Sequence, residues 1–90
     1  MTIPDYLVIG TITKDLLEDG FTIGGTATYA AATASRLGKR AAIVTSAGAD
    51  LVVPDDLSDV QIMCAPSPAT TTFRNVYVGD ARQQYVTALA

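Results

Sequence analysis

The apolar residues of the chain predict two buried strands with one helix between them. Residues 6–9 and 41–45 are short, almost wholly apolar runs, and a run that is apolar on both faces is typical of a strand buried in a parallel sheet. Within residues 26–37, apolar residues recur at helical spacing: Ala27, Ala30, Ala31, Ala34 and Leu37. Gly38 follows, where a helix C-terminus favours a positive φ. The pattern predicts a β-α-β unit.

The segment between the first strand and the helix is less regular. Residues 11–19 mix polar and apolar positions, and we interpret them as a connection that ends at Gly20. Residues 21–23 alternate between apolar and polar, which predicts a short strand directly before Gly24 and Gly25.

After residue 49 the pattern changes. Residues 50–59 predict a loop with a short helical turn, and residues 60–64 predict a short strand. Residues 70–78 are rich in Thr, Phe, Tyr and Val, and a Gly-Asp turn signal separates them from the mixed pattern of residues 82–89. Two such segments joined by a turn predict a β-hairpin.

The composition fits one small folded domain. The chain has 90 residues, of which 49% are hydrophobic and 17% are charged, and this is a globular rather than a disordered composition. Much of the apolar content is alanine and valine, and there is no tryptophan. Because alanine buries little area, we expect a thin core with little stability to spare.

Charge and cysteine content exclude several classes of protein. The net charge is −3 and the six Lys and Arg residues are scattered, so no nucleic-acid partner is expected. Cys64 is the one cysteine, which excludes an internal disulfide and a cysteine-built metal cluster, and we expect its thiol to be buried. An acidic group lacks metal-ligand spacing, and we interpret it as a solvated surface without a metal: Asp55, Asp56 and Asp59.

Nothing in the sequence predicts a membrane or export segment. No apolar run approaches the roughly 18 residues that span a bilayer. The N-terminus lacks a basic stretch, and Asp5 interrupts it early, so we expect no signal peptide. We therefore expect no membrane partner and a cytoplasmic location.

The glycine pair Gly24 and Gly25 is the first candidate for chemistry. Two glycines let a ligand approach the backbone closely, and the N-terminus of the following helix offers unpaired N–H groups that can hold hydroxyls or an anion. Taken alone, the pair is better explained as a tight turn before a helix.

The spacing around the pair is more informative. Residues 24–31 read GGTATYAA and are followed by Gly38 and Gly48, which resembles the N-terminal signature of the PfkB (ribokinase-like) carbohydrate kinase family. Tyr29 departs from that signature, because asparagine is usual at its position. Gly10 with Asp15 five residues later also resembles the family. The family resemblance also includes Gly48 with Asp50, and the threonine-rich segment that starts at residue 70. The similarity covers nearly all of the chain.

The resemblance implies an α/β fold, a three-layer ribokinase-like fold that is truncated and has a small β lid. Residues 1–58 would form the start of the α/β core and residues 59–90 a lid-like β segment. The implied activity is ATP-dependent phosphorylation of a hydroxyl on a sugar, polyol or nucleoside.

The resemblance also implies a substrate site. Asp15 matches the family's aspartate that binds substrate hydroxyls, and an ionised carboxylate can accept hydrogen bonds from two hydroxyls at once. Gly24, Gly25 and Tyr29 complete the candidate substrate-binding set. For Tyr29, a wall beside the substrate and packing on the helix both stay open. For Thr72 and Phe73, packing within the hairpin is favoured over a position that faces the substrate from the lid. Arg74 and Arg82 are expected to be solvated, and Asp50 is expected to cap or turn the chain.

The family's catalytic machinery has no counterpart in these residues. In the family, a glycine-rich C-terminal motif supplies an aspartate that acts as base, beside N–H groups that stabilise the transferring phosphoryl group. Residues 86–90 contain neither Gly nor Asp. We therefore expect no catalytic residue and no cofactor for this chain alone, with ATP and Mg serving a full-length parent.

Two other classes stay open. One is a non-catalytic binding or dimerisation module in which exposed strands of the β lid pair with another chain, giving a homodimer. The other is a Rossmann-type nucleotide-binding unit, which requires Gly-x-Gly-x-x-Gly directly after the first strand. The residues that follow Gly10 do not match that pattern.

Overall fold

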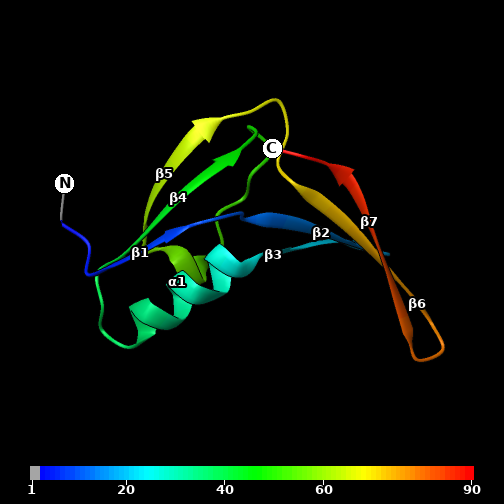
Figure 1. Cartoon of the computed structure of the whole chain (residues 1–90), viewed down its shortest axis with the longest axis horizontal. Helices are drawn as coiled ribbons and strands as arrows, with labels where there is room; N and C mark the ends of the chain where they lie inside the picture. The colour runs from blue at the N-terminus through cyan, green and yellow to red at the C-terminus, as the bar shows by residue number, and fades with distance from the viewer. Residues whose placement is uncertain (1–2) are drawn as a thin grey trace.

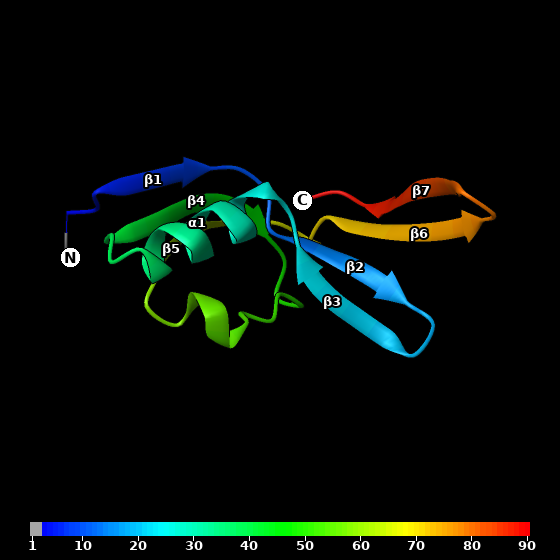
Figure 2. The same cartoon turned by 90° about the horizontal axis from the view of Figure 1, so that it is seen from below.

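The computed structural model describes residues 3–90, which form two sheets and one α-helix (Figures 1 and 2). The first sheet is parallel, with strand order β1-β4-β5: β1 (Tyr6–Ile9), β4 (Ala41–Ala47) and β5 (Gln61–Pro66). The second sheet has strand order β3-β2-β6-β7: β2 (Thr13–Leu17), β3 (Gly20–Gly24), β6 (Thr72–Val78) and β7 (Ala81–Ala88). The helix α1 (Thr26–Arg36) lies against the first sheet, and a 3₁₀ turn, η1 (Asp55–Leu57), precedes β5.

The predicted helix is confirmed as α1, and it ends just before Gly38, as predicted. Gly38 has φ of 83°, and its N–H donates to the carbonyl of Ser35 at 3.0 Å. The N–H of Lys39 donates to the carbonyl of Ala34, also at 3.0 Å. These two bonds form a Schellman motif, which satisfies carbonyls that the helix end leaves free.

The core lies between α1 and the first sheet and is thin, as the composition predicted. Few large side chains are fully buried in it: Ile12, Ile43 and Leu57. The remaining buried positions are mainly small: Ala27, Ala31, Ala34 and Ala41, with Val60. Small side chains let the helix lie close to the strands, but each buries little apolar area.

The prediction that β1 is buried on both faces was wrong for this chain. Val8 packs against the core, whereas Leu7 is 52% exposed and Ile9 is 78% exposed. Successive side chains of a strand point to opposite faces, so Leu7 and Ile9 lie on the face away from α1. That face, and one edge of β1, have no neighbour among residues 3–90. Cys64, also predicted to be buried, is exposed because β5 forms the other edge of this sheet.

The second sheet differs from the predicted connection at residues 11–19. Residues 13–17 form β2, which pairs antiparallel with β3 and parallel with the start of β6. Local polarity did not reveal this strand, because its partner β6 lies more than fifty residues away in the sequence. The predicted hairpin of β6 and β7 is confirmed, with a turn at Gly79, whose φ is 60°.

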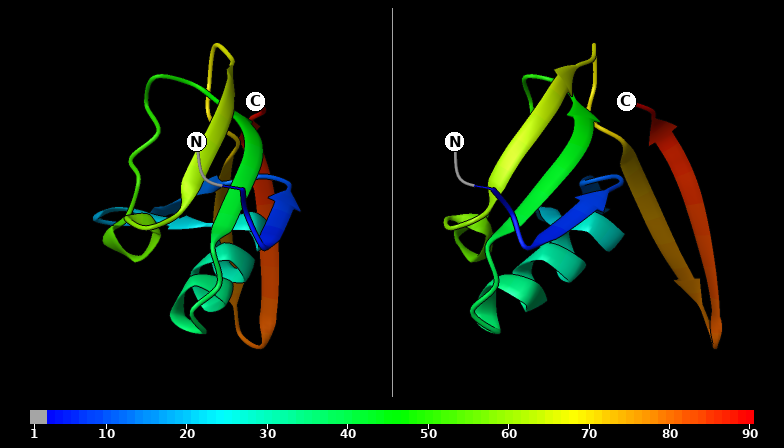
Figure 3. Two further views of the ribbon diagram at one scale, coloured as in Figure 1. Left: turned by 90° about the vertical axis from the view of Figure 1, so that its left-hand side faces the viewer. Right: turned by 60° about the vertical axis from the view of Figure 1, so that its left-hand side comes forward.

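The two sheets also divide the chain differently from the expected boundary at residue 58. Residues 61–66 pair with β4 in the first sheet, and residues 13–24 enter the second sheet. Figure 2 shows the second sheet extending away from the helix and the first sheet, and in Figure 3 the hairpin of β6 and β7 stands apart from both. We call the second sheet the lid sheet.

Candidate functional site

The structure brings Asp15 and Gly24 together. Asp15 lies on β2, and Gly24 ends the neighbouring strand β3, where it pairs with Thr13. A Cβ atom built on Gly24 would lie 2.5 Å from Oδ2 of Asp15, so only glycine leaves room for this carboxylate. The hydroxyl of Thr13 donates to Oδ1 of Asp15 at 2.9 Å, and this bond orients the carboxylate.

The next residue, Gly25, starts the helix beside that carboxylate. Its φ is 93°, a conformation that residues with a Cβ rarely adopt, and a Cβ there would clash with the carbonyl oxygen of Thr11. Among residues 3–90, no side chain caps this end of α1, and its first turn contains no acidic residue. The free N–H groups of the first turn, together with the positive end of the helix dipole, suit an anion or a hydroxyl oxygen.

The structure does not bring Tyr29 into this arrangement. Tyr29 is 62% exposed and lines a shallow, mainly apolar groove of about 460 Å³ together with Tyr6 and Leu37. Neither Asp15 nor the glycine pair lines that groove. The aromatic ring is therefore placed along α1, towards the start of β1, and away from the carboxylate.

Strand register places further polar residues on the same face of the lid sheet as Asp15. Directly paired residues share a face, as do residues two apart along a strand. Asp15 pairs with Thr22 of β3 and with Phe73 of β6, and Asn75 follows Phe73 by two. Sequence analysis missed Thr13, Thr22 and Asn75, because the register that unites them depends on pairing between distant strands.

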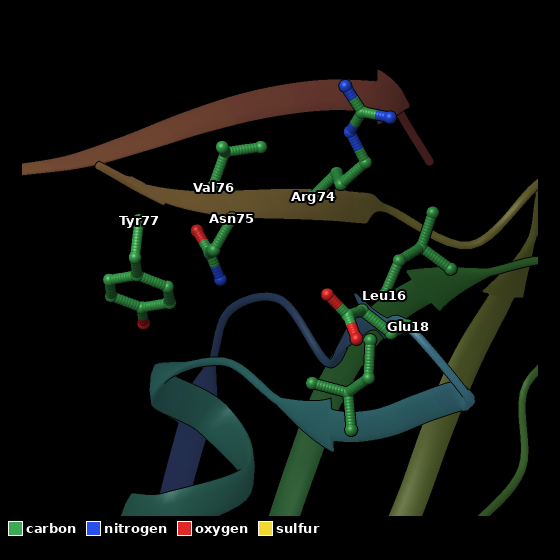
Figure 4. Close-up of a pocket in the computed structure, with 7 residues that line it drawn as sticks. Leu16, Glu18, Arg74, Asn75, Val76 and Tyr77 are labelled. Carbon is green, nitrogen blue, oxygen red and sulfur yellow. The ribbon is translucent and has the colours of Figure 1, made fainter. Parts of the chain in front are cut away.

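A cleft opens where β2 and β6 diverge. Their pairing covers only Lys14 to Leu16 on β2, and beyond it the strands leave a space of about 620 Å³. Seven residues line it (Figure 4): Leu16, Leu17, Glu18, Arg74, Asn75, Val76 and Tyr77. The cleft mixes apolar walls with an acid, a base and an amide, so it can accommodate a polar molecule of moderate size.

Asp50 joins the exit of β4 to the start of β6, in keeping with the turn role that the sequence suggested. Its Oδ1 accepts hydrogen bonds from the N–H of Thr70 at 3.2 Å and from the hydroxyl of Thr70 at 2.8 Å. The same hydroxyl accepts from the N–H of Gly48 at 3.2 Å, and Nζ of Lys14 lies 3.9 Å from Oδ2 of Asp50. The bonds from Thr70 lower the pKa of Asp50 below its usual value. This network anchors the lid sheet to the first sheet.

The other charged residues form no second site in residues 3–90. Arg74 stacks on the ring of Tyr85, with 5.6 Å between the guanidinium carbon and the ring centre, and Asp56 pairs with Arg36 at 3.0 Å on the surface. Within the described residues, no group of three or more His, Cys, Asp or Glu side chains is placed to hold a metal ion. No helix in this range is long and apolar enough to cross a membrane.

The whole arrangement resembles part of several solved kinases. No sequence-family model matches the chain, and no curated protein matches it either. An uncharacterised sugar kinase from Pyrococcus horikoshii is 21% identical, with a TM-score of 0.64 over 90% of this chain and 33% of its own. A pyrophosphate-dependent kinase of the ribokinase family, complexed with a pyrophosphate analogue and myo-inositol, is 20% identical, with a TM-score of 0.61 over 93% of this chain and 32% of its own.

A third similar structure is the tetrameric inhibited form of phosphofructokinase-2 from Escherichia coli. It is 16% identical, with a TM-score of 0.53 over 97% of this chain and 36% of its own. The chain therefore has part of a ribokinase-like fold. The chain spans about a third of the length of these three structures. The predicted fold, a truncated ribokinase-like α/β fold, is confirmed.

Proposed function

We propose that this ribokinase-like chain forms the substrate side of a small-molecule kinase that phosphorylates a hydroxyl of a sugar, polyol or nucleoside. The observation that supports this most directly is the carboxylate of Asp15. The hydroxyl of Thr13 orients it, and it lies against Gly24 at the start of α1. A carboxylate that lies against Gly24, two residues before α1 begins, offers acceptor oxygens that suit vicinal hydroxyls.

The phosphoryl donor is proposed to be ATP with Mg²⁺, bound by residues outside this chain. Pyrophosphate is the alternative, because one of the similar structures is described as pyrophosphate-dependent. Within residues 3–90 no carboxylate group is placed for a metal ion. By the family resemblance, we assign no catalytic residue to this chain and expect no cofactor for it alone. We place its action in the cytoplasm.

The experiment is a binding titration of the 90-residue chain with myo-inositol, a ligand present in one of the similar structures, followed by ¹⁵N NMR. Asp15→Asn should weaken binding roughly ten- to a hundredfold, because it removes a charge-assisted acceptor. Asp19→Asn is the matched control, since Asp19 is exposed in the turn between β2 and β3. In a coupled assay with ATP and Mg²⁺, or with pyrophosphate, the same samples should form no product. Equal myo-inositol affinities for the wild type and Asp15→Asn would show that Asp15 does not contact the substrate.

A second candidate function is dimerisation through the lid sheet. Strand β7 forms an edge of that sheet, and β6 and β7 expose large apolar side chains: Tyr77, Val78, Tyr85 and Val86. An exposed strand edge with apolar residues is a template for pairing with another chain. Sedimentation equilibrium of the wild type and of Val86→Lys tests this candidate. The wild type should have the mass of a dimer and the variant that of a monomer, and a monomeric wild type would contradict dimerisation.

A further inference from the structure

We infer that Thr13 is a positioning residue of the substrate site, which acts through Asp15 and does not contact the substrate itself. The inference rests on the proposed function and deepens it, because it assigns the residue that fixes the direction of the Asp15 carboxylate. Three observations carry it: the bond between the two side chains, the burial of Thr13, and the glycine against which both side chains lie.

The two side chains lie on one face of β2 and share a hydrogen bond. Thr13 and Asp15 are two residues apart in the strand, so both side chains emerge on the same face of the lid sheet. The hydroxyl of Thr13 donates to Oδ1 of Asp15 over 2.9 Å. A hydrogen bond to an ionised acceptor is stronger than one between neutral groups. It therefore favours one rotamer of Asp15 over the others that this half-buried side chain could adopt.

Thr13 offers almost no surface to a ligand, whereas Asp15 does. Thr13 is 4% exposed, and Asp15 has an intermediate exposure. Because a β-branched side chain is restricted at χ1, the hydroxyl of Thr13 donates from a fixed position. The influence of Thr13 on a bound substrate must therefore pass through the Asp15 carboxylate.

Gly24 leaves room for both partners of this bond. A Cβ atom built on Gly24 would lie 3.2 Å from Oγ1 of Thr13 and 2.5 Å from Oδ2 of Asp15. Thr13 also pairs with Gly24 across β2 and β3. The carboxylate is thus constrained on two sides, with Oδ1 bonded to Thr13 and Oδ2 against Gly24. A group that is fixed before the ligand arrives loses less conformational freedom on binding, which strengthens binding.

Two substitutions of Thr13 separate positioning from a structural role. Thr13→Val keeps a branched side chain that suits a strand, but it removes the hydroxyl. Thr13→Ser keeps the hydroxyl but removes a buried methyl group, which lowers stability. Positioning predicts weak binding by the valine variant and near-wild-type binding by the less stable serine variant. A structural role predicts instead that affinity follows stability in both variants.

The first measurement needs no ligand. Three-bond NMR couplings from Cγ of Asp15 to its backbone nitrogen and carbonyl carbon report its χ1 rotamer. Wild type and Thr13→Ser should hold one rotamer, and Thr13→Val should average over several. Thr72→Val is the matched control and should keep the Asp15 rotamer. Thr72 is a buried threonine of the same sheet whose hydroxyl donates to the carbonyl of Thr70, and its pairing with Lys14 places it on the opposite face.

The second measurement is a titration of the 90-residue chain with myo-inositol, followed by ¹⁵N NMR. Thr13→Val should weaken binding about tenfold, because a carboxylate that changes rotamer leaves its binding orientation. In an Asp15→Ala background, Thr13→Val should have no further effect, since there is no carboxylate to position. Thr72→Val should bind like the wild type. Thr13→Ala replaces Thr13→Val if the valine variant does not fold.

The outcomes distinguish this inference from the proposed function. If Asp15→Asn weakens binding and Thr13→Val leaves the affinity unchanged, the role of Thr13 is wrong and the Asp15 site stands. A single Asp15 rotamer in Thr13→Val, or an affinity that follows the melting temperature through the valine and serine variants, would also overturn the inference. If the wild type does not bind myo-inositol, the proposed polyol site falls, and the role of Thr13 in substrate binding falls with it.

Discussion

At the scale of single residues, Gly24 matters for the space that it leaves. Its backbone conformation is one that any residue can adopt, since its φ is not positive. The constraint is instead the carboxylate of Asp15, which occupies the place where a Cβ would lie. Gly25 differs, because its φ of 93° and the nearby carbonyl of Thr11 both exclude a side chain. The two adjacent glycines therefore differ: Gly24 leaves room for the Asp15 carboxylate, and Gly25 allows the backbone conformation at the start of α1.

The first prediction concerns Gly24→Ala. The new methyl group should displace the Asp15 carboxylate and weaken myo-inositol binding by roughly tenfold or more, since a charge-assisted hydrogen bond would be misaligned. Gly10→Ala is the control, because its Cβ would make an ordinary 3.6 Å contact with Ala27. Calorimetric titration of both variants measures the effect. Unchanged affinity for Gly24→Ala would show that the carboxylate does not contact the ligand.

At the scale of elements, a charged pair joins the starts of β1 and β4. The side chain of Arg40 donates two hydrogen bonds to Asp5, from Nε at 3.2 Å and from an Nη atom at 2.9 Å. The backbone N–H of Arg40 also donates to Asp5 at 3.1 Å. The Arg40 side chain is the main cause that lowers the pKa of Asp5 to about 2. Both side chains are largely exposed, so this pair fixes strand register more than it stabilises the fold.

The second prediction follows from the sign of that shift. A carboxylate with a depressed pKa in the folded state stabilises the fold above its unfolded value of 3.8. This contribution disappears as the pH falls through about 2. Wild type should therefore lose more stability than Asp5→Asn between about pH 4 and pH 2, and added salt should shrink the difference. Urea titrations over this range measure it. Parallel acid profiles for the two proteins would show that Asp5 and Arg40 are not paired in solution.

At the scale of the whole molecule, much apolar surface is uncovered. Large hydrophobic side chains are exposed on both sheets and on α1, among them Ile9 and Tyr29, and the buried core is built largely from alanine. Exposed apolar surface of this extent favours association with other apolar surfaces. Within the part of the chain that the structure describes, the outer strands of both sheets have no strand neighbour on one side, which leaves backbone groups there unpaired.

The third prediction is that the isolated 90-residue chain is only marginally stable. A thin core and open sheet edges should give a broad thermal transition with a concentration-dependent midpoint or aggregation. Circular dichroism melts at several protein concentrations measure this. Replacing Ile9, which is 78% exposed, with Lys should reduce aggregation without lowering the midpoint. A sharp, reversible and concentration-independent melt would show instead that the chain is a complete domain.

The sequence by itself determined the local elements of this protein. Alanine spacing and Gly38 defined the helix and its end, because both depend on contacts within a few residues. The apolar runs located β1 and β4, and the Gly-Asp signal located the turn between β6 and β7. The glycine spacing and Asp15 also indicated the ribokinase-like fold, which the structural similarity confirms.

Only the tertiary structure decided how distant segments combine. Strand β2 exists because β3 and β6 pair with it, and its own residues show no clear strand pattern. The same pairing places Asp15 beside Phe73 and on one face with Asn75. Pairing with β4 places β5 in the first sheet and not in the lid sheet. Exposure likewise depends on neighbours, so the apolar residues of β1 and the thiol of Cys64 are exposed at sheet edges. The hydrophobic pattern indicates which secondary structure a segment favours, but pairing between distant strands determines which residues its side chains contact.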